Sequence, residues 1–507
     1  MQEDTICAPA TPAGKGGVSI VRVSGPQALA AAVAIGGKVV SAMASHTLRL
    51  ATLRDSEGII DQAVVSYYKA PHSYTGEDVV EFSVHGSPYI VQRLMQALFA
   101  LGVRLAEAGE FTKRAFLNGR MDLSQAEAVA DLISGETKAA HDLALRQLRG
   151  GFSSEIETLR LKLLEFASLV ELELDFGEED VEFADRSQLR DLLKELGLKV
   201  DSMRASFRLG NAIKEGIPVA IIGKPNAGKS TLINALLHEE RALVSDVPGT
   251  TRDTIEEVWY IGGMKFRFID TAGLRQSEDK VEQMGIERTL QKMRQARVWL
   301  YVYDASAMTL DMARDEVRLY VEQFLGYQPF PEAGSVALEG MGDRESTGVP
   351  AGLLDRNREC IGGERKRIEG GMKVGGEVAR GLEAPNIIMI ANKVDAIGRE
   401  AGREGDVLYL SAKQGMGMNL LEDALRALIP SLPDENALVL SNARHYEVLG
   451  LVEIDLRKVE SGLDSGLPGD LLAMDIRSAI DHLGLITGKI LADDILGTVF
   501  SKFCIGK

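Results

Sequence analysis

The sequence has little cysteine, no long apolar run and a shortage of positive charge. Its three cysteines, Cys7, Cys360 and Cys504, are too few and too scattered for a disulfide framework or a zinc cluster, so a reducing cytoplasm is the expected location. No apolar run reaches the roughly eighteen residues of a membrane span, and the N-terminus lacks the basic and apolar regions of a signal peptide. Lys and Arg number 57 against 74 Asp and Glu, a net charge of −17. This charge argues against a chain-wide footprint for nucleic acid or an anionic membrane and leaves room only for a local basic patch.

What is present is the balance of a soluble globular protein. Hydrophobic residues make up 45% and charged residues 26% of the 507 residues, which excludes wholesale disorder. At about 150 residues per domain, this length predicts roughly three domains.

Residues 1–118 are predicted to form an α+β domain, because short β-rich runs such as 18–23 and 79–84 alternate there with Gly and Pro. From Leu123 the apolar side chains recur at three- and four-residue spacing, which predicts a helical bundle. The predicted helices are 124–149, 154–175, 187–214, 440–461 and 468–492. An all-α helical domain is therefore expected over 119–215 and 430–507, on both sides of a third domain.

That third domain, 216–429, is predicted to be a doubly wound α/β domain with a mostly parallel sheet, because strand candidates alternate with amphipathic segments. The strand candidates are 218–222, 265–269, 298–303, 386–391 and 407–410.

Two segments of unusual composition, one rich in glycine and one acidic, are interpreted as solvent-exposed connections. Residues 326–384 contain 13 glycines among 59 residues without a period, which favours a surface insertion. Its basic cluster at 364–367 has no interleaved aromatic residues, so a solvated loop is favoured over an RNA contact. The acidic run 171–182 has no nearby His or Cys and is interpreted as a connection rather than a metal site.

The stretch 223–230, GKPNAGKS, matches the phosphate-binding pattern GxxxxGK[ST] between a predicted strand and a predicted helix. Its backbone N–H groups and the helix N-terminus favour a phosphate, Lys229 can reach the β- and γ-phosphates, and Ser230 can bind Mg²⁺. A glycine turn with a chance lysine is the less favoured alternative. The expected nucleotide contacts here are Asn226, Ala227, Gly228, Lys229, Ser230 and Thr231.

Three further motifs indicate GTP. Asp270-Thr271-Ala272-Gly273 ends a predicted strand, where its carboxylate suits Mg²⁺, commonly through water, and its glycine amide suits the γ-phosphate. Asn392-Lys393-Val394-Asp395 ends another strand, and the last carboxylate can accept two N–H bonds from guanine that adenine does not offer. Ser411-Ala412-Lys413 is expected to contact the base through its backbone.

The water-orienting glutamine of Ras-like GTPases is missing, because Leu274 follows the DxxG motif. Acidic candidates for that task are Glu278, Asp279 and Glu282.

Switch I is expected at 249–253, with Thr251 completing the Mg²⁺ shell. For Arg252 and Arg275, surface ion pairing and an arginine-finger role are both open at this point.

Four short stretches outside the GTP motifs carry a family resemblance: Asp4-Thr5-Ile6 with Gly16-Gly17-Val18, SYTGED at 73–78, GEFTKR at 109–114 and CIGK at 504–507. With a GTPase domain interrupting a helical one, the chain resembles the MnmE (TrmE) family of tRNA modification GTPases, except over 326–384. Other GTPases with a leucine after DxxG, such as Era and Der, have neither this N-terminal region nor this tail.

The resemblance implies that the N-terminal domain binds a formyl-tetrahydrofolate and mediates homodimerisation. It places Arg22, Glu81, Arg120 and Lys507 at the folate. Cations suit the glutamate tail of a folate and a carboxylate suits the edge of its pterin, although the family often has lysine at the position of Arg120, which changes the geometry.

The resemblance also implies that G domains dimerise face to face and that K⁺ occupies the place of an arginine finger. The implied K⁺ contacts are Asn226, Ser245, Val247 and Thr250, and the nucleotide contacts extend over Asp246, Pro248, Gly249 and Thr251. Glu282 would position water, beside Lys229 and Arg275 as catalytic residues. For Asn226, a side-chain turn that stabilises the loop is the alternative.

The implied activity is potassium-stimulated GTP hydrolysis that, with the flavoprotein MnmG (GidA), installs an aminomethyl or carboxymethylaminomethyl group at C5 of the wobble uridine of certain tRNAs. A GTP-controlled ribosome or RNA assembly factor and an ATP-using P-loop enzyme are the alternatives; the folate-like region opposes the first and Asp395 the second. The CIGK tail fits a prenylation signal poorly, and whether Cys504 does chemistry or its tail only closes the folate site stays open.

Overall fold

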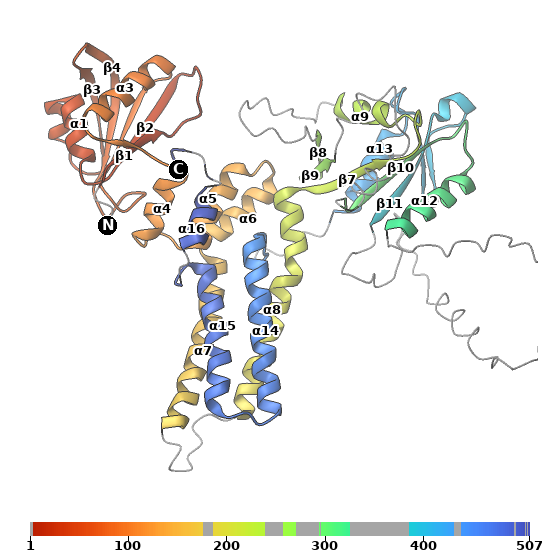
Figure 1. The fold of residues 1–507 in the computed structure, drawn as a ribbon. Coiled ribbons are helices and arrows are strands. Elements are labelled where there is room, and N and C mark those ends of the chain that lie inside the picture. Colours follow the sequence, from red (N-terminus) through yellow and green to blue (C-terminus); the bar gives the residue numbers. More distant parts are fainter. Residues whose placement is uncertain are drawn as a thin grey trace, which may run out of the picture. The chain divides into compact units, whose positions relative to one another are not determined.

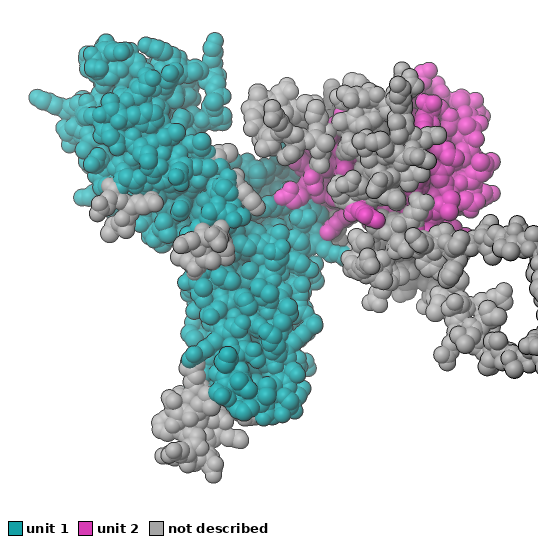
Figure 2. Space-filling model, in the orientation of Figure 1, with its two compact units in different colours: residues 1–214, 433–507 teal, residues 215–432 magenta. Residues whose placement is uncertain are grey.

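The structure, a computed structural model, describes residues 4–175, 186–238, 257–269, 294, 296–324, 385–429, 438–490, 493–501, 503 and 505–507. The chain forms two compact units, Met1–Lys214 with Pro433–Lys507 and Glu215–Leu432 (Figure 2). The second unit is therefore inserted into the first. None of the described helices is long and apolar enough to cross a membrane.

The first unit contains a six-stranded sheet in the order β3-β4-β5-β2-β1-β6. All its neighbouring strands are antiparallel except β1 and β6. One face packs on α1 and α3 and forms a buried apolar core, so the strands alternate buried and exposed side chains. The elements are β1 (Ile6–Pro9), β2 (Val18–Ser24), α1 (Ala28–Gly36), α2 (Lys38–Ser41), β3 (Thr47–Asp55), β4 (Gly58–Tyr68), β5 (Val79–His85), α3 (Pro88–Ala100) and β6 (Arg104–Leu105).

The rest of the first unit is helical. The long helices α7, α8, α14 and α15 run side by side (Figure 1) and share one apolar core that draws on chain from both sides of the inserted unit. The helices are α4 (Glu110–Leu117), α5 (Leu123–Ser134), α6 (Lys138–Leu148), α7 (Gly151–Asp175), α8 (Arg186–Glu215), α14 (Ala443–Asp464), α15 (Gly469–Thr487) and α16 (Asp493–Phe500).

The largest differences from the predicted helix boundaries lie in two segments. The segment 124–149 forms two helices, because α5 ends at Ser134 and the Thr137 side chain caps the start of α6. The helix predicted over 468–492 is shorter in the structure, since Gly488 adopts a left-handed conformation that ends α15 at Thr487.

The second unit is built on a seven-stranded sheet in the order β12-β13-β11-β10-β7-β9-β8. The five inner strands are parallel and the two edge strands antiparallel. The elements are β7 (Ile217–Ile222), α9 (Lys229–His238), β8 (Glu257–Ile261), β9 (Met264–Phe268), β10 (Val298–Asp304), α12 (Leu310–Phe324), β11 (Asn386–Asn392), the 3₁₀ helix η2 (Val394–Ile397), β12 (Gly402–Glu404), β13 (Val407–Tyr409) and α13 (Met418–Arg426).

The predicted fold class is confirmed: an α+β N-terminal part, an all-α part and an inserted α/β part with a mostly parallel sheet. The boundary between 1–118 and the helical domain remains a prediction, because both lie in one compact unit. The insertion 326–384 and most of the acidic run 171–182 lie outside the described residues.

Candidate functional site

The predicted phosphate loop connects β7 to α9, and two of its glycines are required by close contacts. Gly223 has a φ of 138°, and a Cβ there would lie 2.0 Å from the Val302 carbonyl oxygen on β10. At Gly228, with a φ of 92°, a Cβ would lie 2.1 Å from the Asn392 Nδ2. The loop backbone is therefore pressed against the ends of β10 and β11, where open α/β sheets bind ligands.

The polar residues of this loop lie in and just before the first turn of α9. Lys229 Nζ donates to the carbonyl oxygens of Gly223 and Lys224, both at 2.6 Å. Asn226 is in the left-handed region, with a φ of 63°. Ser230 and Thr231 belong to the first turn of α9, where N–H groups and the helix dipole favour an anion.

Asn392 joins three of the sequence motifs. Its Nδ2 donates to the Ala227 carbonyl at 2.9 Å, and its Oδ1 accepts from the Ala412 N–H at 3.0 Å. The side chain is only 2% exposed. Because both ends of the carboxamide are used, Asn392 fixes the phosphate loop relative to the Ser411–Lys413 loop.

Asp395 is the residue that the sequence predicts to select the base. Its Oδ1 is buried and has no hydrogen-bond partner among the described residues. A buried acceptor without a partner is costly, so this atom calls for a donor from a ligand. Guanine offers two N–H donors on one edge, and the arrangement fits it.

Much of the expected metal and catalytic machinery lies outside the described residues. The predicted residues concerned are Ser245, Asp246, Val247, Pro248, Gly249, Thr250, Thr251, Arg252, Asp270, Thr271, Ala272, Gly273, Arg275, Glu278, Asp279 and Glu282. Of the expected Mg²⁺ and K⁺ contacts, the structure describes Ser230 and Asn226, and both lie on the phosphate loop or the first turn of its helix.

The first unit holds a second cluster of predicted residues, on the six-stranded sheet. Arg22 on β2 and Glu81 on β5 are register partners, and Arg22 Nε donates to the Glu81 carboxylate at 2.8 Å. The guanidinium carbon lies 5.1 Å from the centre of the Tyr74 ring and 5.6 Å from that of Phe111. A charged pair with aromatic walls suits a planar heterocycle with polar edges.

Arg120 and the chain end adjoin this cluster. Asn118 and Arg120 lie against Gly76, where a Cβ would be 3.2 Å from the Arg120 Cγ. Gly76 belongs to the same 73–78 loop as Tyr74. At the other end of the cluster, a Cβ on Gly506 would be 2.1 Å from the Pro9 carbonyl oxygen.

That contact places Lys507 next to β1, where Pro9 pairs with Val21 and Ala8 with Arg22. Ile505 also forms a bridge with Ala108. Cys504 lies outside the described residues.

The aromatic residues Tyr74 and Phe111 were missed as site residues, although both belong to the 73–78 and 109–114 stretches that carry the resemblance. Burial raises the pKa of Tyr74 despite its hydrogen bond to Thr112. The phenol therefore stays neutral at physiological pH.

A buried network of ion pairs adjoins the Arg22–Glu81 cluster. Arg114, 2% exposed, donates to Asp4 at 2.8 Å and to Glu110 at 2.9 Å, and it contacts Glu77 at 3.2 Å. Burial opposes the ionisation of Glu110, but hydrogen bonds from Arg104 and Arg114 outweigh it and lower its pKa. The network joins α4 to the 73–78 loop that carries Tyr74.

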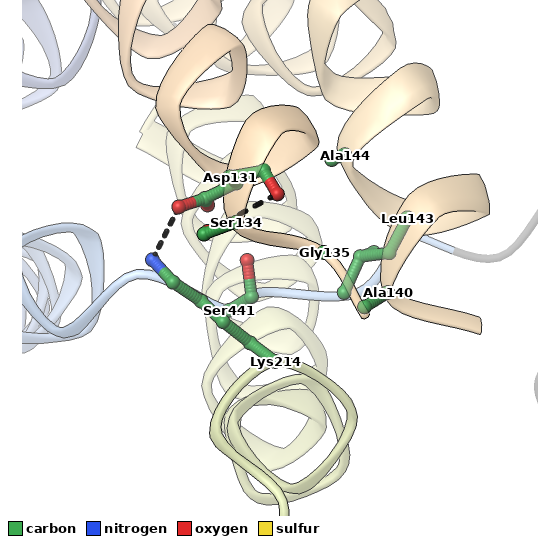
Figure 3. Close-up of a pocket in the computed structure, with 8 residues that line it drawn as sticks. All are labelled: Asp131, Ser134, Gly135, Ala140, Leu143, Ala144, Lys214 and Ser441. Carbon is green, nitrogen blue, oxygen red and sulfur yellow. Dashed lines mark hydrogen bonds and ion pairs between the residues drawn. The ribbon is translucent and has the colours of Figure 1, made fainter. Parts of the chain in front are cut away.

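A small pocket lies where the chain leaves the first unit (Figure 3). In it, Lys214 on the last turn of α8 pairs with Asp131 on α5 at 2.8 Å. Ser441, on the segment that returns from the second unit, accepts a hydrogen bond from Gln147 at 3.2 Å. The segment that leads into the second unit therefore contacts α5, and the segment that returns from it contacts the adjacent helix α6.

Known proteins resemble the chain over its whole length. Residues 5–120 match the family described as "GTP-binding protein TrmE N-terminus", and residues 123–504 match "MnmE helical domain". The tRNA modification GTPase MnmE of Christiangramia forsetii is 45% identical, with 99% of each chain covered. That of Cytophaga hutchinsonii is 44% identical over 99% of this chain and 98% of its own.

Proposed function

Because the chain belongs to the MnmE family of tRNA modification GTPases, we propose that it is a cytoplasmic, potassium-stimulated GTPase that modifies C5 of the wobble uridine of certain tRNAs. It acts together with MnmG (GidA), and a folate provides the one-carbon unit. The modification is an aminomethyl or carboxymethylaminomethyl group. GTP hydrolysis drives a rearrangement of domains and does not itself supply the carbon.

The observation that carries the GTP part of the proposal is the orphaned, buried Oδ1 of Asp395. Guanine N–H groups bind this carboxylate, and Lys229 and the start of α9 hold the phosphates. Ser230 and Thr251 are proposed to bind Mg²⁺, which would offset the charge that develops on the phosphates. Glu282 is proposed to position the attacking water, since Leu274 stands where a Ras-like enzyme has glutamine.

Potassium is proposed to bind beside the phosphate loop through Asn226, Ser245, Val247 and Thr250. Two observations support this assignment: Asn226 is exposed, and it adopts a left-handed conformation in a loop whose backbone is fixed by Gly223 and Gly228. A cation there offsets charge between the β- and γ-phosphates, the task that an arginine finger performs elsewhere.

A formyl-tetrahydrofolate is proposed to bind at the Arg22–Glu81 pair. The pair is half-buried on the sheet and has the rings of Tyr74 and Phe111 beside it. Arg120 and Lys507 add positive charge near the same cluster, which suits the carboxylates of the glutamate tail.

A second copy of the chain is proposed to cover the sheet face that carries this pair. Leu48 and Leu50 on the edge strand β3 are 61% and 64% exposed, and Val64, the register partner of Leu50, is 40% exposed. Leu48 belongs to the same cross-strand row as Glu81 and Arg22. Exposed apolar side chains on an edge strand favour a protein contact, so dimerisation and folate binding would share one face.

The proposal is tested by deleting the gene and measuring tRNA nucleosides by mass spectrometry. Loss of the C5-modified wobble uridine is expected, and unchanged wobble uridines would leave the RNA assembly factor as the better account. In the purified protein, GTP turnover is expected to be faster in potassium chloride than in sodium chloride. Equal turnover in the two salts would refute the potassium part alone.

A further inference from the structure

The end of β10 holds a carboxylate that none of the GTP motifs contains. Asp304 is the last residue of β10 and the register partner of Asn392, the last residue of β11. The strands continue their contact beyond that point, because the Ala305 N–H donates to the Asn392 carbonyl at 2.9 Å. Asp304 therefore lies directly opposite the first residue of the base-binding motif, on the neighbouring strand.

The Asp304 side chain is fully engaged. Its Oδ2 accepts from Lys393 Nζ at 2.7 Å, and its Oδ1 accepts from the Ser306 N–H at 2.9 Å and from the Ser306 hydroxyl at 2.6 Å. Burial opposes ionisation, but the bonds from Lys393 and Ser306 outweigh it, so the pKa of Asp304 is lowered. The group is thus an anion at neutral pH whose orientation is fixed by the turn that follows β10.

Lys393 is the residue that needs such an anchor. It has a φ of 65°, in the left-handed region that a residue with a Cβ rarely adopts. From this residue the chain turns into η2, which presents Asp395. The Lys393 side chain is 38% exposed, so packing alone does not hold it, and the ion pair with Asp304 is its described polar contact.

We propose that Asp304 is a positioning residue for guanine binding: by holding Lys393, it fixes the turn that presents Asp395 to the base. Asn392 anchors the same motif to the phosphate loop, and Asp304 anchors it to β10. The motif is thereby held from two sides, one through each of its first two residues. Asp304 itself need not touch the nucleotide.

The inference rests on the proposed GTP site, and the two can fail separately. If the unmodified full chain did not bind GDP, the GTP site itself would be wrong. If it bound GDP and the substitution of Asp304 left binding unchanged, only the role of Asp304 would be wrong.

The test measures GDP affinity and steady-state GTP hydrolysis for D304N, K393M and the double variant in the full chain. D304N keeps an oxygen for Ser306 but removes the charge, and it is expected to raise the Kd for GDP and the KM for GTP about tenfold. The kcat is expected to stay within about twofold, since the effect is on ground-state binding. The double variant is expected to be no weaker than K393M alone, because both changes remove one interaction.

A matched control is available in the same unit. Asp406 pairs with Arg314 at 2.8 Å with similar exposure of the carboxylate, and D406N is expected to leave the Kd for GDP unchanged. If D304N failed to fold, D304E would carry the test. Its longer side chain displaces Lys393, so a threefold rise in Kd is expected, about half of a tenfold effect in free energy.

A wild-type Kd in D304N or D304E, or multiplicative effects of D304N and K393M, would overturn the proposal.

Discussion

Lys214 Nζ lies 2.8 Å from the Asp131 carboxylate, so the last turn of α8 is fastened to α5 one residue before the inserted unit begins. Both side chains are largely shielded, with 27% and 14% exposed. Beyond this pair the chain passes through Gly216, which has a φ of 87° and packs against Lys265. The ion pair is thus made by the last residue of the first unit before the chain enters the second unit.

Replacing Asp131 by Asn is expected to destabilise the first unit by about 1 kcal/mol, because it leaves the partly shielded Lys214 without its counter-charge. Urea unfolding, followed by circular dichroism, measures the change. D142N is the control, since its partner Lys138 is 88% exposed and the loss there should stay below about 0.5 kcal/mol. Equal losses in the two variants would contradict a special role for the Asp131 pair.

Acid is expected to weaken the helical part through Glu127. This residue accepts from Arg444 Nε at 2.8 Å and lies 2.7 Å from His445 Nε2. Burial raises its pKa, but the pairs with His445 and Arg444 outweigh burial and lower the pKa to about 2.

Because the folded-state pKa lies below the unfolded one, the stabilisation is complete above about pH 4.5 and is lost as the pH falls toward 2. The loss amounts to roughly 3 kcal/mol. E127Q is expected to flatten the dependence of the free energy of unfolding on pH over this range. Parallel curves for E127Q and the unmodified protein would rule the group out as the cause.

Gly228→Ala is expected to weaken GDP binding by about a hundredfold, because the new methyl group would displace the Asn392 carboxamide that aligns two loops. Fluorescent GDP titration gives the value. Gly405 is a matched control, since its φ is also positive, at 61°, but no atom lies within 4 Å of its position for a Cβ. G405A should lose stability without losing GDP affinity, and a loss of affinity there would show that the assay reports general strain.

Arg22→Met is expected to weaken binding of 5-formyltetrahydrofolate by 10- to 100-fold, about the value of one or two charge-assisted hydrogen bonds. Isothermal titration calorimetry measures it. Arg93 on α3 serves as the control, because its side chain has the same 16% exposure and also pairs with a sheet carboxylate, Asp55. If R93M reduced folate affinity as much as R22M, the proposed folate site would be in the wrong place.

Leu50→Glu is expected to shift the protein from dimer to monomer, because a charge on β3 would have to be buried in the proposed interface. Sedimentation velocity distinguishes the two states. Val39, 48% exposed on α2 before β3, provides the matched control V39E. A dimer that survives L50E unchanged would place the interface on another surface.

The place of the local sequence motifs in the fold could be predicted from the sequence. The phosphate loop and the Asn392–Asp395 motif lie at the ends of strands that could be predicted from short apolar runs. The contact from Asn392 to Ala227 could not be predicted, because it depends on how β11 lies in the sheet. The same holds for Asp304, which has no motif of its own and gains its role from its register with Asn392.

The Arg22–Glu81 pair shows the same limit in the first unit. The family resemblance predicts both residues, but their direct bond depends on the register of β2 with β5, which joins residues 59 positions apart. The predicted helix 124–149 was wrong for a local reason. Apolar periodicity continues across 135–137, whereas α5 ends before Gly135 and α6 begins after Thr137. Periodicity reports which face is buried and does not report where a helix stops.

The apolar core shared by α7, α8, α14 and α15 has a consequence for biosynthesis. Its second half, α14 and α15, begins at Ala443, about 230 residues after α8 ends at Glu215. At a translation rate of about 5–20 residues per second, α14 and α15 are synthesised on the order of 10–50 seconds after α7 and α8, whose apolar faces they cover. The GTP-binding unit is completed during that interval, so it is expected to fold first and to bring the two halves of the bundle together as a preformed, closed loop.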